Sequence, residues 1–536
     1  MLTAVQIKYG GITPVWFRSI NIIIHALCTL LLMGIVRIIC ARATTRWVQE
    51  RAEFIAAGVG VLCAVHPVYT QTVAYVVQGH MEGLATLCIL GAVYAFLCEY
   101  RYVAGAIALL STGTKEIAII IPVLLLFTEY VFNKKNITIN YRYHAVLIAS
   151  VLALYGYFLG INFFKNSLLL HAQAVNTPGN MIINPVGSGG IVKVFDFLRA
   201  QPGVLLHYVV ILVWPFNLCP EYDWVIPSSW GSSEVVVPLL VLSTLAASIY
   251  YVWRSSGEKI ILYCVGWFIL CVAPRMTLIP SSELVADYKL YGASMGLLLV
   301  LVAALFWTID SVVLWWGAEK KKHAPWVYSI VGITLMTFLG YTSAQRLQVW
   351  SSDLAFWHDV LVHCPRKARA YNNYGAALSR AGKYADAVYF LRRAISFQED
   401  NYSEPYANLG AAYAHMGDSK SALRAYLIGM QVNSDHPELY YNAAVIMEKQ
   451  GDFLRAKTLL KKALQLRRTY GKALFLLGNI ARKSGDLYGA YEYFKQACTA
   501  ADLDVSSAAW RTYARVAESI GYYDESKKAY AHAQKI

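Results

Sequence analysis

The chain has 536 residues, of which 57% are hydrophobic and 15% are charged, and its mean hydropathy is +0.43. Soluble domains usually contain about 25% charged residues, so this composition excludes an ordinary soluble protein and favours a membrane protein. The formal net charge of +14 would suggest nucleic-acid binding in a soluble chain. In a membrane protein, basic cytoplasmic loops explain it, and we predict no nucleic-acid partner.

Apolar runs of membrane-spanning length dominate the chain up to residue 343. A bilayer core requires about 20 apolar residues in a helix. The candidate spans are 16–37, 54–70, 83–99, 104–133, 143–163, 203–216, 234–253, 259–274, 292–316 and 325–343. The run 104–133 is too long for one span and could form two short ones around Lys115 and Glu116. We therefore expect a polytopic membrane module over residues 1–345 with roughly ten or eleven spans.

Basic residues gather in loops between these spans, and such loops remain on the cytoplasmic side. They include Arg37, Arg42, Arg46, Arg51, Lys134, Lys135, Arg254, Lys259, Lys320, Lys321 and Lys322. The last span then leaves everything after residue 345 on the opposite side of the membrane. The count of crossings between 143 and 253 agrees with this only if 203–216 is re-entrant or a further span lies around 191–202.

A repeat pattern begins after a connecting helix predicted at residues 346–366. Turn glycines recur at Gly382, Gly417, Gly451, Gly485 and Gly521, with successive differences of 35, 34, 34 and 36 residues. A small residue follows each glycine by five positions: Ala387, Ala422, Ala456, Ala490 and Ser526. A period of about 34 residues is that of the tetratricopeptide repeat, a helical hairpin. The sequence thus predicts an all-α chain: a membrane helical bundle followed by a solenoid of five repeats over 367–536.

Tetratricopeptide arrays present a concave surface that binds polypeptide segments. The repeats therefore predict a protein partner in their groove, although a purely architectural array is the alternative. The basic residues Lys461, Lys462, Arg467 and Arg468 fit either a solvated helix face or a site for an acidic peptide.

Polar side chains interrupt the apolar runs at five places, and burying them in a membrane is costly unless they are paired. They are Arg18, Asn21 and His25; His66, His80 and Glu82; Lys115 and Glu116; Glu221 and Asp223; and Arg275, Asp287 and Lys289. The alternatives to a functional role are packing for the first group, a self-neutralising pair for Lys115 and Glu116, and an interfacial loop around Asp223. The ten cysteines lack metal-ligand spacing, so we predict no metal site. No motif of a soluble enzyme, such as a P-loop or HExxH, is present.

In this order, several segments resemble the transmembrane and tetratricopeptide repeat-containing (TMTC-type) protein O-mannosyltransferases. These segments are NIIIH (21–25), AVHPVYTQTVA (64–74), GHMEGLA (79–85), KE (115–116), YDW (222–224), ADYKLYGAS (286–294) and RLQVWSSDLAFW (346–357), followed by the repeats. The resemblance implies a GT-C type membrane fold and transfer of mannose from dolichyl-phosphate mannose to Ser or Thr hydroxyls of an acceptor protein. It also implies an endoplasmic reticulum membrane location with lumenal repeats. We expect no bound cofactor, because the lipid-linked sugar is a substrate.

The resemblance and the charges of the interrupting residues suggest their roles. We expect Lys115, Arg275, Lys289, His80 and Arg18 to bind the donor phosphate. Asp223 and Glu82 are the candidate catalytic carboxylates, and the supporting polar network is Asn21, His25, His66, Glu116 and Asp287.

This sequence departs from the family pattern at three points. The family usually has Arg where His80 stands and Glu-Arg where Asp287 and Tyr288 stand. It also has one further span and an acidic lumenal loop before NIIIH, and we expect this chain to begin at the tail of that loop. The expected catalytic base would then be missing, either because the sequence is truncated at its start or because canonical catalysis has been lost. Two alternatives to the transferase stay open: an inactive membrane-anchored repeat scaffold, and a bacterial-type transferase that uses another polyprenyl-linked sugar on an envelope component, with periplasmic repeats.

Overall fold

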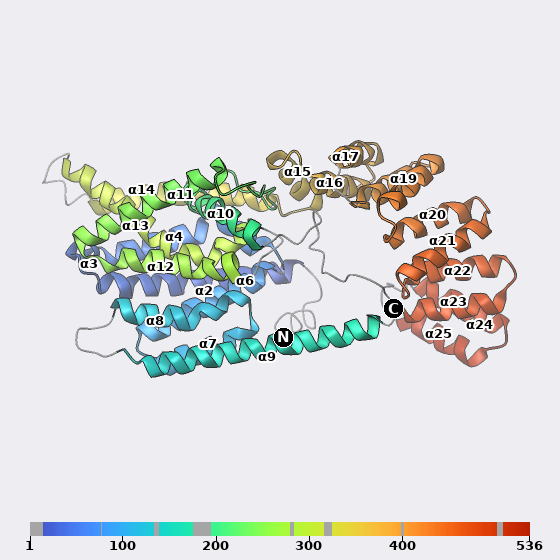
Figure 1. The fold of residues 1–536 in the computed structure, drawn as a ribbon, viewed down its shortest axis with the longest axis horizontal. Coiled ribbons are helices and arrows are strands. Elements are labelled where there is room, and N and C mark those ends of the chain that lie inside the picture. The colour runs from blue at the N-terminus through green and yellow to red at the C-terminus, as the bar shows by residue number, and fades with distance from the viewer. Residues whose placement is uncertain are drawn as a thin grey trace. The chain divides into compact units, whose positions relative to one another are not determined.

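The computed structural model describes residues 14–76, 78–132, 139–174, 194–278, 284–315, 324–397, 401–500 and 507–535. Within these ranges the regular structure is helical and no strand occurs, so the predicted all-α class is confirmed. The chain forms two compact units that meet in sequence between His363 and Cys364, and each unit is described by itself (Figure 1).

The membrane unit contains long apolar helices whose axes are roughly aligned (Figure 1). Its α-helices are α2 Pro14–Ala41, α3 Arg46–Glu50, α4 Ala52–Val65, α5 Thr70–Ala74, α6 Gln78–Leu97, α7 Arg101–Leu110, α8 Ile121–Phe132, α9 Tyr141–Ala174, α10 Val194–Val213, α11 Ser233–Ser256, α12 Lys259–Ala273, α13 Tyr291–Trp315, α14 Ala324–Gln348 and α15 Asp353–His363. Shorter helical segments are η1 Pro67–Tyr69, η2 Ser111–Gly113, η3 Glu116–Ile120, η4 Pro274–Leu278 and η5 Asp287–Leu290.

Seven described helices, namely α2, α6, α10, α11, α12, α13 and α14, are long and apolar enough to cross a membrane. The pair formed by α4 and the segment Pro67–Ala74, bent by 49°, makes a further candidate. The run 104–133 contains two short helices, α7 with 10 residues and α8 with 12. Each is shorter than the roughly 20 residues that one crossing requires, and η2 and η3 lie between them.

Two ends of the membrane unit can be told apart by their contacts. At the first, which we call the basic end, the backbone N–H groups of Thr44 and Thr45 donate to Glu258, at 3.1 and 2.9 Å. Arg51 also pairs with Asp310 there, near the C-terminus of α13. The basic loop after α2 thus meets the start of α12 at Glu258 and the last turns of α13 at Asp310. The other end, where α6 and α13 begin, is called the cluster end below.

Helix α10 stays at the cluster end, although its composition would allow it to cross. Gly203 packs against Trp224, the Tyr208 hydroxyl donates to the Ala286 carbonyl at 3.4 Å, and the His66 ring bonds to the Leu212 carbonyl at 3.0 Å. From Gly203 to Leu212 the helix advances about 14 Å along its axis. Gly203, Tyr208 and Leu212 nevertheless all contact residues at the cluster end. These contacts are compatible with a re-entrant 203–216, one of the two arrangements that would reconcile the crossing count between 143 and 253, and that arrangement stays a prediction.

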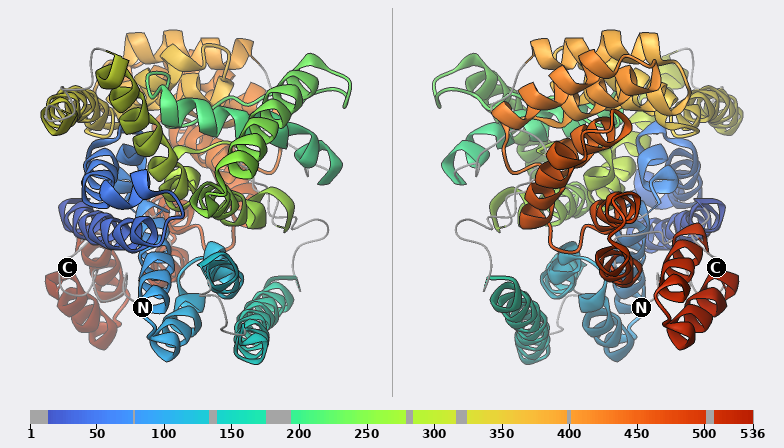
Figure 2. Two further views of the ribbon diagram at one scale, coloured as in Figure 1. Left: turned by 90° about the vertical axis from the view of Figure 1, so that its left-hand side faces the viewer. Right: turned by 90° about the vertical axis from the view of Figure 1, so that its right-hand side faces the viewer.

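The second unit consists of paired helices. These are α16 Ala368–Arg380 with α17 Tyr384–Ser396, α18 Glu404–His415 with α19 Ser419–Val432, α20 Pro437–Lys449 with α21 Phe453–Leu466, α22 Gly471–Lys483 with α23 Leu487–Thr499, and α24 Ser507–Ser519 with α25 Tyr523–Lys535. Figure 2 shows them as successive hairpins.

Each hairpin turns at a glycine, and these five glycines have φ between +76° and +88°. Glycine adopts this left-handed conformation without the steric cost that a Cβ imposes. After three of the turns an aspartate caps the second helix: Asp418, Asp452 and Asp486 accept from the backbone N–H three residues later. The alanine five residues beyond the glycine is fully buried in the first four hairpins, which lets the two helices approach closely.

The ion pairs of Glu438 should make the stability of α20 and α21 depend on acidic pH. A hydrogen bond from His436 at 3.2 Å, with Arg467 at 2.7 Å, lowers the pKa of Glu438 to about 2 from 4.5. A carboxylate with a lowered folded-state pKa contributes stability above its unfolded pKa and loses it as the pH falls through the folded value. We expect hydrogen-exchange protection of α20 and α21, corrected for intrinsic rates, to fall between about pH 4.5 and about pH 2. In Glu438→Gln this fall should be smaller, and an unchanged profile would contradict the prediction.

Candidate functional site

Interruptions in several helices of the membrane unit meet at the cluster end. Segment η3 packs against α6 and η4, and η5 packs against α5 and α6. Backbone that departs from the α-helix leaves N–H and C=O groups without intrahelical partners, and a membrane tolerates this only where protein or water supplies them. Interrupted helices of this kind also bring their ends, and the polar residues there, to one place.

Four charged side chains, on α6, at the start of η3 and on η4, form a cluster in which all but Glu116 are buried or nearly so. Glu82, on the first turns of α6, is fully buried, and its Oε2 accepts from Lys115 Nζ at 2.9 Å and from Arg275 Nη2 at 2.7 Å. Glu116 lies 3.7 Å from Arg275 Nε. The Lys115 ammonium also lies over the Tyr288 ring, 4.7 Å from its centroid. We call Glu82, Lys115, Glu116 and Arg275 the charge cluster, and its two positive and two negative charges balance.

Burial makes the pairing obligatory, because a charge removed from water must be compensated by an opposite charge and by hydrogen bonds. The side chains of Lys115 and Arg275 are only 10% and 8% exposed. Both cations bind one oxygen of Glu82, and within the described part of the chain its second oxygen, Oε1, has no hydrogen-bond partner. Thr86 Oγ1, one turn further along α6, is also buried without a partner there. Such atoms often bind ordered water or a ligand.

A second buried carboxylate lies next to the charge cluster. Asp287, which begins η5, accepts a hydrogen bond from the Tyr222 hydroxyl at 2.7 Å. Burial, and then the charge of Asp287, raise the pKa of Tyr222 far above its usual value, so the phenol keeps its proton. Gln71 on α5 ties the same loops together: its amide donates to the Pro220 carbonyl at 3.1 Å, and its oxygen accepts from the Tyr288 N–H at 2.9 Å.

Removal of the Tyr222 hydroxyl should weaken this arrangement. In Tyr222→Phe the buried Asp287 loses its donor, and an unsatisfied buried acceptor costs about 1–3 kcal/mol. We expect the free energy of unfolding in detergent micelles to fall by this amount. The matched control is Tyr250→Phe on the exposed face of α11, where surface substitutions change stability by about 0.5 kcal/mol or less. Equal effects of the two variants would contradict the role given to Tyr222.

The remaining predicted site residues lie at the same end but make other contacts. Arg18 donates to the carbonyls of Ala74 at 3.3 Å and Trp350 at 2.7 Å. Asn21 donates to the carbonyls of Val73 and Tyr75, and its oxygen lies 3.1 Å from His80 Nδ1. These contacts fix the stretch between α5 and α6 that carries the break.

Two predicted histidines bind neighbouring helices. His25 Nδ1 lies 2.7 Å from the Tyr291 hydroxyl, and His66 bonds to the end of α10. Lys289 is buried in η5, and its carbonyl accepts from Arg275 Nη1 at 3.4 Å. Of the two catalytic candidates, Glu82 lies inside the charge cluster, whereas Asp223 is exposed on the loop that carries Tyr222.

Sequence reasoning missed a polar network at the basic end. Asp310 near the end of α13 accepts from Arg51 Nη2 at 2.5 Å, from Trp47 Nε1 at 2.6 Å and from the Tyr328 hydroxyl. Its signal was present in the sequence, since Asp310 is a lone carboxylate in the apolar run ALFWTIDSVVLWW (304–316). A charge at such a position needs a partner.

Comparison with known proteins supports both halves of the sequence prediction. The family model described as "Tetratricopeptide repeat" matches residues 368–401, 437–470 and 471–502. Protein O-mannosyl-transferase Tmtc3 of Drosophila melanogaster is 23% identical over 306 residues, covering 52% of this chain and 32% of that protein. Protein O-mannosyl-transferase TMTC3 of Mus musculus is 21% identical over 546 residues, covering 92% of this chain and 55% of that protein. The chain therefore spans about one third to about one half of these relatives.

Among solved structures, the match to the crystal structure of MamA covers 30% of this chain and 92% of the MamA chain, with 19% identity and a TM-score of 0.27. The match to the crystal structure of YrrB, a TPR protein with an unusual peptide-binding site, covers 33% of this chain and 90% of the YrrB chain. The two are 16% identical, and the TM-score is 0.27. The relatives' names and the matched repeats confirm the resemblance found in the sequence: this chain is similar to the TMTC-type proteins, with a polytopic helical membrane unit followed by tetratricopeptide repeats.

Proposed function

We propose that this chain transfers mannose from dolichyl-phosphate mannose to Ser or Thr hydroxyls of an acceptor protein. The observation that carries the proposal is the pair of buried cations, Lys115 and Arg275, held at one point by Glu82 at the cluster end. The names of the relatives support the reaction class. A donor with a polyprenyl chain stays in the bilayer, so its phosphate must be met by cations within a membrane unit.

The reaction needs three contributions from the protein. The acceptor oxygen bonds to the anomeric carbon as the bond from that carbon to the phosphate oxygen breaks, and the electron pair leaves with dolichyl phosphate. Lys115 and Arg275 stabilise the charge on this leaving phosphate, and Glu82 positions them. Lys289, His80 and Arg18 are the other candidate phosphate contacts. No bound cofactor or metal takes part in this scheme.

The acceptor hydroxyl must release its proton to a carboxylate base. We assign this role to Asp223, because Glu82 is already bound by two cations and Asp223 is exposed on the loop tied to Asp287. Asp223→Asn should lower kcat for mannosyl transfer by about 10²–10⁴-fold, the usual contribution of general-base catalysis. Glu221→Gln, two residues away on the same loop, is the matched control and should retain turnover. If Asp223→Asn turns over as fast as the unchanged protein, the assignment fails.

The repeats would bind the acceptor, since tetratricopeptide arrays bind polypeptide segments. We place the cluster end and the repeats on the lumenal side of the endoplasmic reticulum membrane, because the basic end carries the loops that stay cytoplasmic. Deletion of 367–536 should abolish transfer to proteins while transfer to short Ser/Thr peptides persists. An unchanged choice of acceptor proteins would contradict this role of the repeats.

A further inference from the structure

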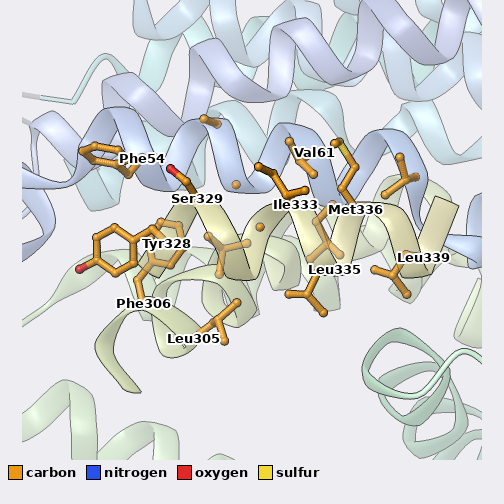
Figure 3. Close-up of a pocket in the computed structure, with 16 residues that line it drawn as sticks. Phe54, Val61, Leu305, Phe306, Tyr328, Ser329, Ile333, Leu335, Met336 and Leu339 are labelled. Carbon is orange, nitrogen blue, oxygen red and sulfur yellow. The ribbon is translucent and has the colours of Figure 1, made fainter. Parts of the chain in front are cut away.

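An apolar groove runs along the membrane unit between α4, α13 and α14 (Figure 3). No residue of the charge cluster lines it. Its volume is about 300 Å³, and of its sixteen lining residues only Tyr328 and Ser329 have polar side chains. Helix α14 is a candidate span of which only 11% is buried within the unit. A groove beside such a helix faces hydrocarbon rather than water.

The groove ends at the polar network of the basic end. On α4 its lining residues Phe54, Gly58, Leu62 and Val65 follow Arg51 at helical spacing, so Arg51 continues the same face. Tyr328 joins the two regions. Its ring stacks on Phe306 in the groove, with centroids 4.5 Å apart, while its hydroxyl bonds to Asp310 and accepts from Arg51 Nε at 3.0 Å.

A second cavity with a mixed polar and apolar lining lies beyond this network. Its volume is about 550 Å³, and it is lined by Arg46, Trp47, Glu50, Arg51, Trp307, Asp310, Ser311, Val313 and Leu314. Arg46 pairs with Glu50 at 2.8 Å, and these side chains are 88% and 52% exposed. An exposed i,i+4 pair is worth only about 0.3–0.5 kcal/mol, so Arg46 can exchange this partner for a ligand at little cost.

We propose that this groove and cavity together bind one glycerophospholipid of the leaflet at the basic end. An acyl chain would occupy the groove, and the phosphodiester would bind Arg46 in the cavity, with Arg51 and Trp47 beside it. The order of surfaces, from apolar groove to hydrogen-bonded network to arginine-containing cavity, matches the order of groups along a phospholipid. The site lies at the opposite end from the charge cluster and does not depend on the proposed transfer reaction.

The groove is tested by filling it. Gly332 on α14 lines the groove, and a Cβ there would meet nothing within 4 Å, so Gly332→Leu places a side chain in the lipid's space without a clash at its Cβ. Gly340 on the same helix has equally open space but does not line the groove, which makes Gly340→Leu the matched control. Phospholipid retained by the full chain after detergent purification is identified and quantified by mass spectrometry.

The cavity is tested by a second pair of variants. Arg46→Gln removes the arginine proposed to bind the phosphodiester. Arg37→Gln removes an arginine in a similarly exposed pair, with Glu53 at 2.6 Å, that does not line the cavity. We expect Gly332→Leu to lose the retained phospholipid and Arg46→Gln to lower it, while both controls retain the amount found in the unchanged protein.

Two outcomes would overturn the proposal. If Gly332→Leu and Gly340→Leu retain equal phospholipid, the groove is not its site. If the lipid lost from Gly332→Leu is a polyprenyl phosphate, the groove belongs to the donor substrate. Neither readout requires mannosyl transfer, so failure of the proposed reaction leaves this test intact.

Discussion

Substitution of Glu82 by Gln is expected to lower the free energy of unfolding of the membrane unit by about 3–5 kcal/mol. The reason is that Lys115 and Arg275 would then be buried without their shared counter-charge, and breaking a buried ion pair from one side costs that much. Glu116, 3.7 Å from Arg275 and 40% exposed, compensates only partly. Unfolding in mixed micelles followed by tryptophan fluorescence reports on this unit, since every tryptophan except Trp510 precedes residue 364.

The matched control for this prediction is Glu53→Gln. Glu53 also pairs with an arginine, Arg37, but the two side chains are 68% and 66% exposed. Exposed pairs contribute about 0–1 kcal/mol, so this variant should unfold nearly as the unchanged protein does. Similar losses in the two variants would mean that burial does not set the strength of the Glu82 pairs, and the charge cluster would lose its physical basis.

Substitution of Lys115 by Met should lower kcat for mannosyl transfer by about 10²–10³-fold, the range seen when one donor that stabilises transition-state charge is removed. Met keeps much of the side-chain volume, and Arg275 still compensates Glu82, so the fold should persist. Turnover of dolichyl-phosphate mannose by the purified full chain is the measurement.

Arg254→Met serves as the control for Lys115→Met, because Arg254 is an exposed cation at the end of α11. It should leave turnover unchanged. If Lys115→Met transfers mannose at the rate of the unchanged protein, Lys115 does not bind the leaving phosphate. If the unchanged protein itself binds polyprenyl phosphate but transfers no sugar, the scaffold alternative replaces the enzyme. A preference for a different polyprenyl-linked sugar would favour the bacterial-type alternative.

The repeats were readable from sequence because their determinants are local. A glycine at φ near +80° and an alanine that lets two helices approach are needed at fixed intervals within each hairpin. The membrane class was readable for a similar reason, since a long apolar run has few other environments available to it. The sequence also indicated which polar residues need partners in the membrane unit, because an isolated charge there is costly.

The identity of those partners depended on the tertiary structure. Lys115 is adjacent to Glu116 in sequence, yet its ion pair with Glu82 joins residues 33 positions apart, and that of Arg275 with Glu82 joins residues 193 positions apart. Nothing in local spacing specifies which helix interruptions will meet. The same holds for Asp287, whose donor Tyr222 comes from a separate loop.

Helix α10 shows most clearly what the sequence determines and what requires the tertiary structure. By itself the sequence determined that residues 203–216 are apolar, and it left open whether this run crosses the membrane or is re-entrant. The structure places most of this run in α10, which is long enough to cross, as are α11 and α12. Only the tertiary structure decided that α10 stays at the cluster end, through its contacts with Trp224, Ala286 and His66. The physical reason is that composition sets which solvent a helix prefers, whereas its direction is set by the neighbours against which it packs.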